Sequence, residues 1–153
     1  MRKITTSNGF EFIVDDNDYE FVSKWRWKFS EKSYIHRCTS KNRKNICIKL
    51  HRLLCDAPED KEVDHIDGNI FNLSRSNLRV CTRFQNAQNR GISKNSATGV
   101  KGVWFRESEN KYQSAIQHNG FVVQLGRFET KEEASRAYSE ASKKFHKEYS
   151  RTG

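Results

Sequence analysis

An Asp-His pair followed by two spaced asparagines is the feature that most restricts what this chain can fold into. Residues 64–90 read DHIDGNIFNLSRSNLRVCTRFQNAQNR, with Asp64 and His65 at the start and Asn77 and Asn86 further along. A carboxylate and a neutral amide oxygen are ligands that suit a hard divalent cation. An imidazole can take a proton from water near neutral pH. Together these residue types indicate metal-assisted hydrolysis.

The same stretch belongs to a longer run that is basic throughout. Between Gly68 and Arg106 there is no Asp or Glu. Binding a polyanion to such a run releases counterions, so the run predicts a phosphate backbone as the substrate. The basic residues expected to contact DNA here are Arg75, Arg79, Arg83, Arg90, Lys94, Lys101 and Arg106.

Composition limits the architecture and the partner. The chain has 153 residues, of which 35% are hydrophobic, so small modules with thin cores are expected. The net charge of +9 favours an anionic partner, either nucleic acid or a membrane surface. No apolar run approaches the roughly 20 residues that cross a bilayer, and MRKITTSNGF does not resemble a signal peptide. We therefore expect a soluble cytoplasmic protein, and of the two anionic partners we expect nucleic acid and no membrane.

The four cysteines, Cys38, Cys47, Cys55 and Cys81, form no CxxC pair. In a reducing compartment we expect them to be buried free thiols. His51 and Cys55 are spaced to share a helix face, so a zinc site is the alternative. His36 and His51 are otherwise expected to be structural or surface residues.

Residues 1–50 are expected to form short strands. The segments 9–16 and 24–29 alternate apolar and polar residues, and the second would place Trp25, Trp27 and Phe29 on one face. Further strands are expected at 33–40 and 45–50. The segment 24–52 is rich in Lys and Arg, with Glu31 as its only acid. Two interpretations stay open for it: a solvated basic face, or an accessory surface that faces DNA.

The middle of the chain predicts a strand–loop–strand–helix unit. A short helix at 50–56 ends before Pro58, and a strand at 62–66 delivers Asp64 and His65 to its end. The turn residues 67–69, a return strand at 77–82 and a helix at 84–90 follow. Residues 91–99 are small and polar, which is typical of a linker.

The C-terminal part predicts three strands and a helix. The strands are expected at 100–106, 111–117 and 121–128, and Asn119-Gly120 indicates a hairpin between the last two. Thr130 and Glu133 match a capping box. The helix that follows would pack on the sheet through Ala134, Ala137, Tyr138, Ala141 and Phe145.

At this point the pattern DHIDGN…NLR…T…QN resembles the HNH endonucleases, in the His-Asn-Asn variant of phage and intron homing enzymes. The resemblance covers residues 48–90 and includes the upstream LHRLL. Residues 96–150 resemble the AP2 DNA-binding domain, and this pairing of units is typical of phage-type homing endonucleases. Residues 1–47 resemble, more weakly, the β-rich region that often precedes the HNH unit.

The resemblance implies an α+β fold. A β-rich region (1–47) would precede a ββα-metal HNH nuclease domain (48–90), followed by a linker (91–99) and an AP2-like DNA-binding domain (100–150) with a three-stranded antiparallel sheet and one helix. It also implies the roles in catalysis. His65 would activate water, Asp64 and Asn86 would hold one divalent metal ion (Mg²⁺ or Mn²⁺), and Asn77 would orient the catalytic loop. Many relatives have Asp-Asn-Arg where this chain has Asn72, Leu73 and Ser74, a departure that could alter rate or specificity.

Alternation along the three C-terminal strands separates two faces. Val103, Phe105, Tyr112 and Ile116 would face the helix. Residues suited to reading base edges in a major groove would face outward: Trp104, Arg106, Gln113, Gln117 and Gln124. Lys101, Lys111 and Arg127 are expected to contact phosphates, which gives affinity without sequence information.

The leading hypothesis is a site-directed, metal-dependent endonuclease acting on double-stranded DNA, in the host cell of a phage or mobile element. The alternatives are a DNA-binding protein with an inactive HNH unit, and an RNA-binding or zinc-stabilised module. A monomer is favoured, and a dimer could cut both strands.

Overall fold

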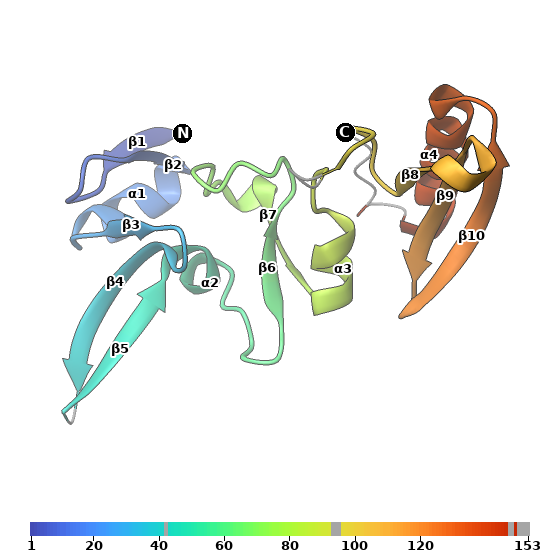
Figure 1. The fold of residues 1–153 in the computed structure, drawn as a ribbon. Coiled ribbons are helices and arrows are strands. Elements are labelled where there is room, and N and C mark those ends of the chain that lie inside the picture. The colour runs from blue at the N-terminus through green and yellow to red at the C-terminus, as the bar shows by residue number, and fades with distance from the viewer. Residues whose placement is uncertain (42, 93–95, 147–148, 150–153) are drawn as a thin grey trace. The chain divides into compact units, whose positions relative to one another are not determined.

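Each strand in the described part of the chain pairs antiparallel with a strand next to it in sequence, and the result is an α+β fold of small sheets and helices (Figure 1). The computed structural model describes residues 1–41, 43–92, 96–146 and 149. It divides into two units, Met1–Arg83 and Phe84–Gly153. Within the described residues, no helix is both long and apolar enough to cross a membrane. The domain limits expected from the sequence stay predictions.

The first unit contains three small sheets and three helical segments before α3. Its elements are β1 (Arg2–Thr5), β2 (Glu11–Val14), α1 (Asp16–Ser23), β3 (Lys28–Ser30), β4 (Tyr34–Lys41), β5 (Lys44–Lys49), α2 (Leu50–Leu54), β6 (Glu62–His65), the 3₁₀ turn η1 (Arg75–Asn77) and β7 (Leu78–Cys81). The sheets are β1–β2, β3–β4–β5 and β6–β7. The helix α3 (Arg83–Gln88) begins at the last residue of this unit.

One hydrophobic core holds this unit together. Residues from the N-terminal region and from the predicted nuclease segment contribute to it equally: Phe12, Val14, Val22, Trp27, Ile35, Leu50, Leu54, Val63, Leu73 and Leu78. Burying a large apolar side chain contributes about 1.5–3 kcal/mol. Because they share this core, the N-terminal strands and the β6–β7 sheet stabilise each other.

The expected strand at 24–29 is wrong. The helix α1 ends at Ser23, and the strand that follows covers only Lys28–Ser30. Trp27 is buried and its indole Nε1 donates a 2.9 Å hydrogen bond to the Val22 carbonyl, whereas Trp25 is 45% exposed beneath the Arg37 guanidinium. The chain turns between α1 and β3, so the two tryptophans have different environments and do not share a face.

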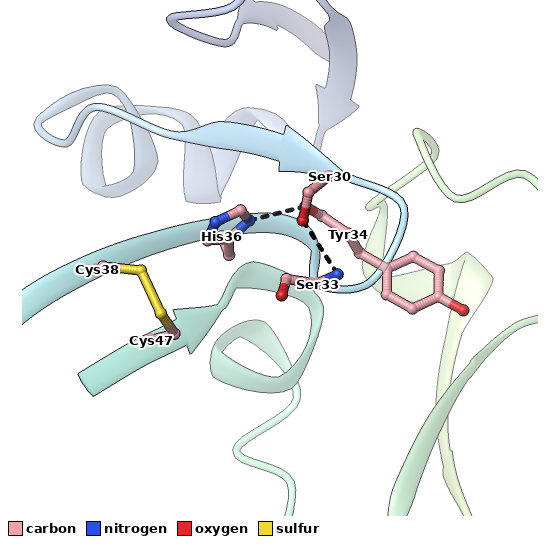
Figure 2. Close-up of a disulfide and its surroundings, with 6 residues drawn as sticks. All are labelled: Ser30, Ser33, Tyr34, His36, Cys38 and Cys47. Atoms are coloured by element: carbon pink, nitrogen blue, oxygen red, sulfur yellow. Dashed lines mark hydrogen bonds between the residues drawn. A yellow bond between two sulfur atoms is a disulfide. The ribbon is translucent and has the colours of Figure 1, made fainter. Parts of the chain in front are cut away.

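The expectation of free thiols is wrong for Cys38 and Cys47, which form a disulfide between β4 and β5 (Figure 2). The strand register places the two residues directly opposite each other, with 4.2 Å between their Cα atoms. Cys55 and Cys81 are free. Burial raises the pKa of the Cys81 thiol to about 11, with Asp64 and Glu62 acting in the same direction, so this thiol stays protonated.

The second unit is a three-stranded sheet covered by a helix, as the C-terminal pattern predicted. Its elements are β8 (Val103–Arg106), the 3₁₀ turn η2 (Glu107–Glu109), β9 (Lys111–His118), β10 (Phe121–Phe128) and α4 (Lys131–His146), with sheet order β10-β9-β8. Asn119 and Gly120 have φ values of 49° and 84°, the backbone of a two-residue hairpin turn. The capping box is confirmed, since Thr130 and Glu133 exchange two 3.3 Å hydrogen bonds.

The helix α4 packs on this sheet through the face expected from its alanines. The core contains Val103, Ile116, Ala134, Tyr138 and Ala141, with Phe145 partly buried against it. Phe105, expected to face the helix, is instead 41% exposed, and its ring lies 5.0 Å from that of Tyr112.

Candidate active site

Strand β6 delivers Asp64 and His65 to the edge of a two-stranded sheet. Both side chains are buried, with 5% and 7% exposed. In the β6–β7 register Asp64 lies opposite Arg79 and His65 lies opposite Leu78. Val63 and Leu78 join the core of the first unit, so the strand that carries the Asp-His pair is anchored by apolar packing.

Asp64 forms a buried ion pair with Arg79. The guanidinium Nε and Nη2 donate to the carboxylate Oδ2 at 2.9 and 2.6 Å, and the Arg79 side chain is 14% exposed. Burying a carboxylate is costly unless it is paired and hydrogen-bonded. The Arg79 guanidinium is therefore a hydrogen-bond and charge partner of Asp64 within the fold. The spacing of the two residues in the sequence did not indicate this pair.

The donor set proposed for a metal consists of oxygen atoms, which suits Mg²⁺ or Mn²⁺. In the described residues no cluster of three His, Cys, Asp or Glu side chains could hold a metal ion, so the zinc alternative with His51 and Cys55 lacks a third ligand of this kind. A cation on Asp64 would have to share the carboxylate with Arg79. Asn86 lies half-buried on α3 in the second unit. Its joint site with Asp64 therefore stays a prediction.

Asn77 braces the loop that follows His65. Its Oδ1 accepts the Asp67 backbone N–H at 2.9 Å, and its Nδ2 donates at 2.9 Å both to Asp67 Oδ1 and to the Asn72 carbonyl. Its own carbonyl accepts the Ile66 N–H at 2.8 Å. One buried amide thus ties both ends of the loop together, and this geometry suits the supporting role expected for Asn77.

Residues 72–74, where many relatives have Asp-Asn-Arg, lie in the same hydrogen-bonded loop. Asn72 Nδ2 donates to Asp67 Oδ2 at 2.8 Å, and Asn72 Oδ1 accepts the Ser74 hydroxyl at 2.9 Å. Leu73 is fully buried in the core. The triplet in this chain therefore braces the loop and contributes a residue to the core.

Burial sets the protonation state of His65. Desolvation lowers the pKa of His65, although Asp64 and Asp67 nearby act to raise it. A lowered pKa leaves the imidazole neutral near neutral pH, the form that can accept a proton. Desolvation acts to raise the pKa of Asp67, but hydrogen bonds from Asn72, Asn69 and Asn77 outweigh it, so the pKa is lowered and the carboxylate stays ionised.

Two aromatic neighbours of His65 were missed by sequence reasoning. The ring centroids of His51 and Tyr34 lie 5.5 and 6.2 Å from that of His65, and 5.3 Å from each other. His51 is buried on α2, where desolvation, with help from His65, Lys49 and Arg52, lowers its pKa to about 3. His51 lies within the LHRLL segment, which is part of the resemblance to the HNH endonucleases. That position could have indicated that His51 lies close to the site. For Tyr34 we find no such signal.

The buried His51 predicts a loss of stability in acid. Its pKa is about 3 in the folded chain and about 6.5 when unfolded, so the unfolded state binds the proton more tightly. Stability is therefore lost as the pH falls below about 6.5, and this one group contributes about 2 kcal/mol between pH 7.5 and pH 5. Denaturant titrations at both pH values should show that His51→Phe reduces the pH dependence by about this amount. An unchanged dependence would contradict a buried neutral His51.

The predicted DNA contacts of the first unit differ in their surroundings. Arg75 pairs through Nε and Nη2 with both oxygens of the buried Asp18 at 2.8 and 2.7 Å, and donates to the Leu54 carbonyl. This arrangement ties α1 and α2 to η1 and gives Arg75 a structural role. Arg83, the last residue of this unit, is exposed. In the second unit Arg90 is also exposed, and Lys94 lies outside the described residues.

The outward face of the second unit carries a polar chain across three strands. The Arg106 guanidinium donates to the Gln113 side-chain oxygen, and the Gln113 amide donates to that of Gln124 at 2.8 Å. Gln113, the middle residue of these hydrogen-bonded side chains, is buried. Gln117 is exposed and Trp104 is 39% exposed.

The expected phosphate contacts of this unit already have partners. Lys111 pairs with Glu129 at 2.9 Å, Arg127 with Glu109 at 2.7 Å, and Lys101 Nζ donates to the Gln88 carbonyl at 2.6 Å. The expected base-reading and phosphate contacts therefore stay predictions.

Comparison with known proteins identifies the family of this chain. The family model described as HNH endonuclease matches residues 50–88. An uncharacterized HNH endonuclease of Acanthamoeba polyphaga mimivirus is 31% identical over 137 residues, which cover 85% of this chain and 67% of that protein. Protein 3.8 of Escherichia phage T7 is 38% identical over 53 residues, 34% of this chain and 44% of its own. No solved structure matches. The chain belongs to the HNH endonuclease family.

Proposed function

We propose that this protein is a metal-dependent, homing-type endonuclease that hydrolyses phosphodiester bonds in double-stranded DNA. The observation that carries the proposal is the placement of Asp64 and His65 side by side at the end of β6, next to a loop that Asn77 closes with hydrogen bonds. Membership of the HNH endonuclease family supports the same chemistry.

In this proposal the neutral His65 imidazole takes the proton from the attacking water. Asp64 and Asn86 would hold one Mg²⁺ or Mn²⁺ ion, which would supply charge neutralisation at the scissile phosphate. Asn77 holds the loop after β6 and so limits movement of His65. Arg79 holds the Asp64 carboxylate in a fixed direction through two hydrogen bonds.

DNA recognition is assigned to the sheet and helix of the second unit, used as an AP2-like module. The exposed Arg106, Gln117 and Gln124 would contact base edges, and the basic residues of both units would neutralise phosphates. A monomer with one active site would nick one strand, and a dimer could cut both.

A second candidate is a DNA-binding protein whose HNH unit no longer cuts. The ion pair between Asp64 and Arg79 favours it, because the guanidinium neutralises the carboxylate that a metal ion would otherwise bind. In this case DNA binding by the second unit would be the whole function.

Metal removal separates the two candidates. Supercoiled plasmids carrying genomic fragments from the organism that encodes the chain should be nicked or linearised with Mg²⁺ or Mn²⁺ and left intact with EDTA. Asp64→Asn should lower the rate about 10²-fold or more, because the metal contributes several kcal/mol of transition-state stabilisation. Plasmids that are retarded in a gel but never cut, with either metal, would support the second candidate.

A further inference from the structure

Tyr34 has a backbone conformation that does not suit its side chain. It is the first residue of β4 and has a φ of 57°, in the left-handed region that favours glycine and asparagine. The turn before it is closed by Ser33, whose N–H donates to the Ser30 carbonyl and to the Ser30 hydroxyl, both at 3.2 Å. Strained backbone of this kind persists only where the surrounding structure requires it, and it is frequent at active sites.

The ring of Tyr34 lies against the proposed general base. Its centroid is 6.2 Å from that of His65 with 21° between the ring planes, an offset stack. It meets His51 edge-on, at 5.3 Å and 77°. Figure 2 shows this ring extending from the β3–β4 turn, on the side away from the disulfide. Tyr34 is 36% exposed, so it lies at the rim of the site, whereas His51 is buried.

The three rings come from three different elements. Tyr34 belongs to β4, His51 to α2 and His65 to β6, and the His51 and His65 centroids are 5.5 Å apart. Aromatic pairs at these separations attract each other in offset or edge-on geometry, which fixes ring orientation as well as position. The imidazole of His65 therefore has two ring neighbours, which also contact each other.

We propose that Tyr34 is a positioning residue: its ring, with His51, holds the His65 imidazole in the orientation that reaches the attacking water. The inference rests on the proposed role of His65 as general base. It also gives a reason for a bulky aromatic residue in a left-handed position, since such strain persists where the surrounding contacts hold the residue in place.

Three substitutions at Tyr34 separate the ring, the hydroxyl and the backbone. Tyr34→Leu removes the ring and should lower kcat about 10–100-fold, because a misplaced catalytic group is costly even at 1 Å, while KM for the cleaved plasmid stays unchanged. Tyr34→Phe keeps the ring and should cut like the wild type. Tyr34→Asn suits the left-handed backbone, so it should melt at the same or a higher temperature and still lose activity.

Asp56→Asn is the matched control for the backbone. Asp56 also has a left-handed φ, of 46°, lies exposed in the same unit and has no role in the proposed site. Its replacement should leave the cleavage rate unchanged. Loss of melting temperature in parallel with activity in Tyr34→Asn would show that Tyr34 is structural, and would overturn the proposal.

A second measurement does not depend on cleavage. In the free protein, the ring-proton NMR resonances of His65 should shift in Tyr34→Leu, through loss of the aromatic ring current, and should stay nearly unchanged in Tyr34→Phe. Unshifted resonances in Tyr34→Leu would overturn the ring contact.

The same variants distinguish failure of this inference from failure of the proposed function. If His65→Ala abolishes cleavage but Tyr34→Leu cuts at the wild-type rate, only the positioning role is wrong. If Tyr34→Phe loses as much activity as Tyr34→Leu, the hydroxyl acts directly and positioning by the ring is wrong. If His65→Ala still cuts, the proposed function fails, and the positioning role fails with it.

Discussion

His65→Ala is expected to lower DNA cleavage by about 10²–10⁴-fold, the usual contribution of a general base. The imidazole is held in a buried setting that lowers its pKa, so it is neutral and ready to accept a proton near neutral pH. Alanine cannot accept that proton, so no general base would deprotonate the attacking water. The measurement is the single-turnover rate of plasmid nicking with Mg²⁺.

The DNA affinity of His65→Ala should stay close to that of the wild type, because the residue acts on water and not on the duplex. Gel retardation of the same plasmid fragment measures it. His65→Asn is a useful companion, since it keeps a polar side chain but no base. A variant that still cuts at the wild-type rate would contradict the role assigned to His65.

Gly102→Ala is expected to destabilise the second unit by about 3 kcal/mol or more, through overpacking and backbone strain together. A Cβ at this position would overlap ring carbons of the buried Tyr138 and lie 2.6 Å from the Ala115 carbonyl oxygen. The Gly102 carbonyl also accepts the Ala115 N–H at 3.0 Å, so the backbone cannot move away without losing a sheet contact. Amide hydrogen exchange in β9 should become about 10²-fold faster.

Gly99→Ala is the matched control. Gly99 has a φ of +66° against +67° for Gly102, but no atom lies within 4 Å of its added Cβ. It should therefore show only the backbone cost, about 1 kcal/mol. Equal destabilisation by the two substitutions would mean that packing against Tyr138 is unimportant.

The C-terminal unit was predictable because its signals are local. Alternation over eight residues, an Asn-Gly turn and a capping box each specify structure within a short stretch. The same holds for the strand that carries Asp64 and His65 and for its return strand, although a loop, residues 66–77, joins them. The prediction of a strand at 24–29 failed because alternation of apolar and polar residues does not reveal that a helix ends immediately before this segment.

The sequence by itself determined the chemical inventory: an Asp-His pair, the two asparagines, the acid-free basic run and the order of strands and helices around them. Only the tertiary structure decided the partners of these groups. In the structure Arg79 pairs with Asp64, Cys38 is bonded to Cys47, and the rings of Tyr34 and His51 lie next to His65. The reason is physical. Strand register across a loop and the packing of distant elements on one core select these contacts, and the type and spacing of the single residues do not indicate them.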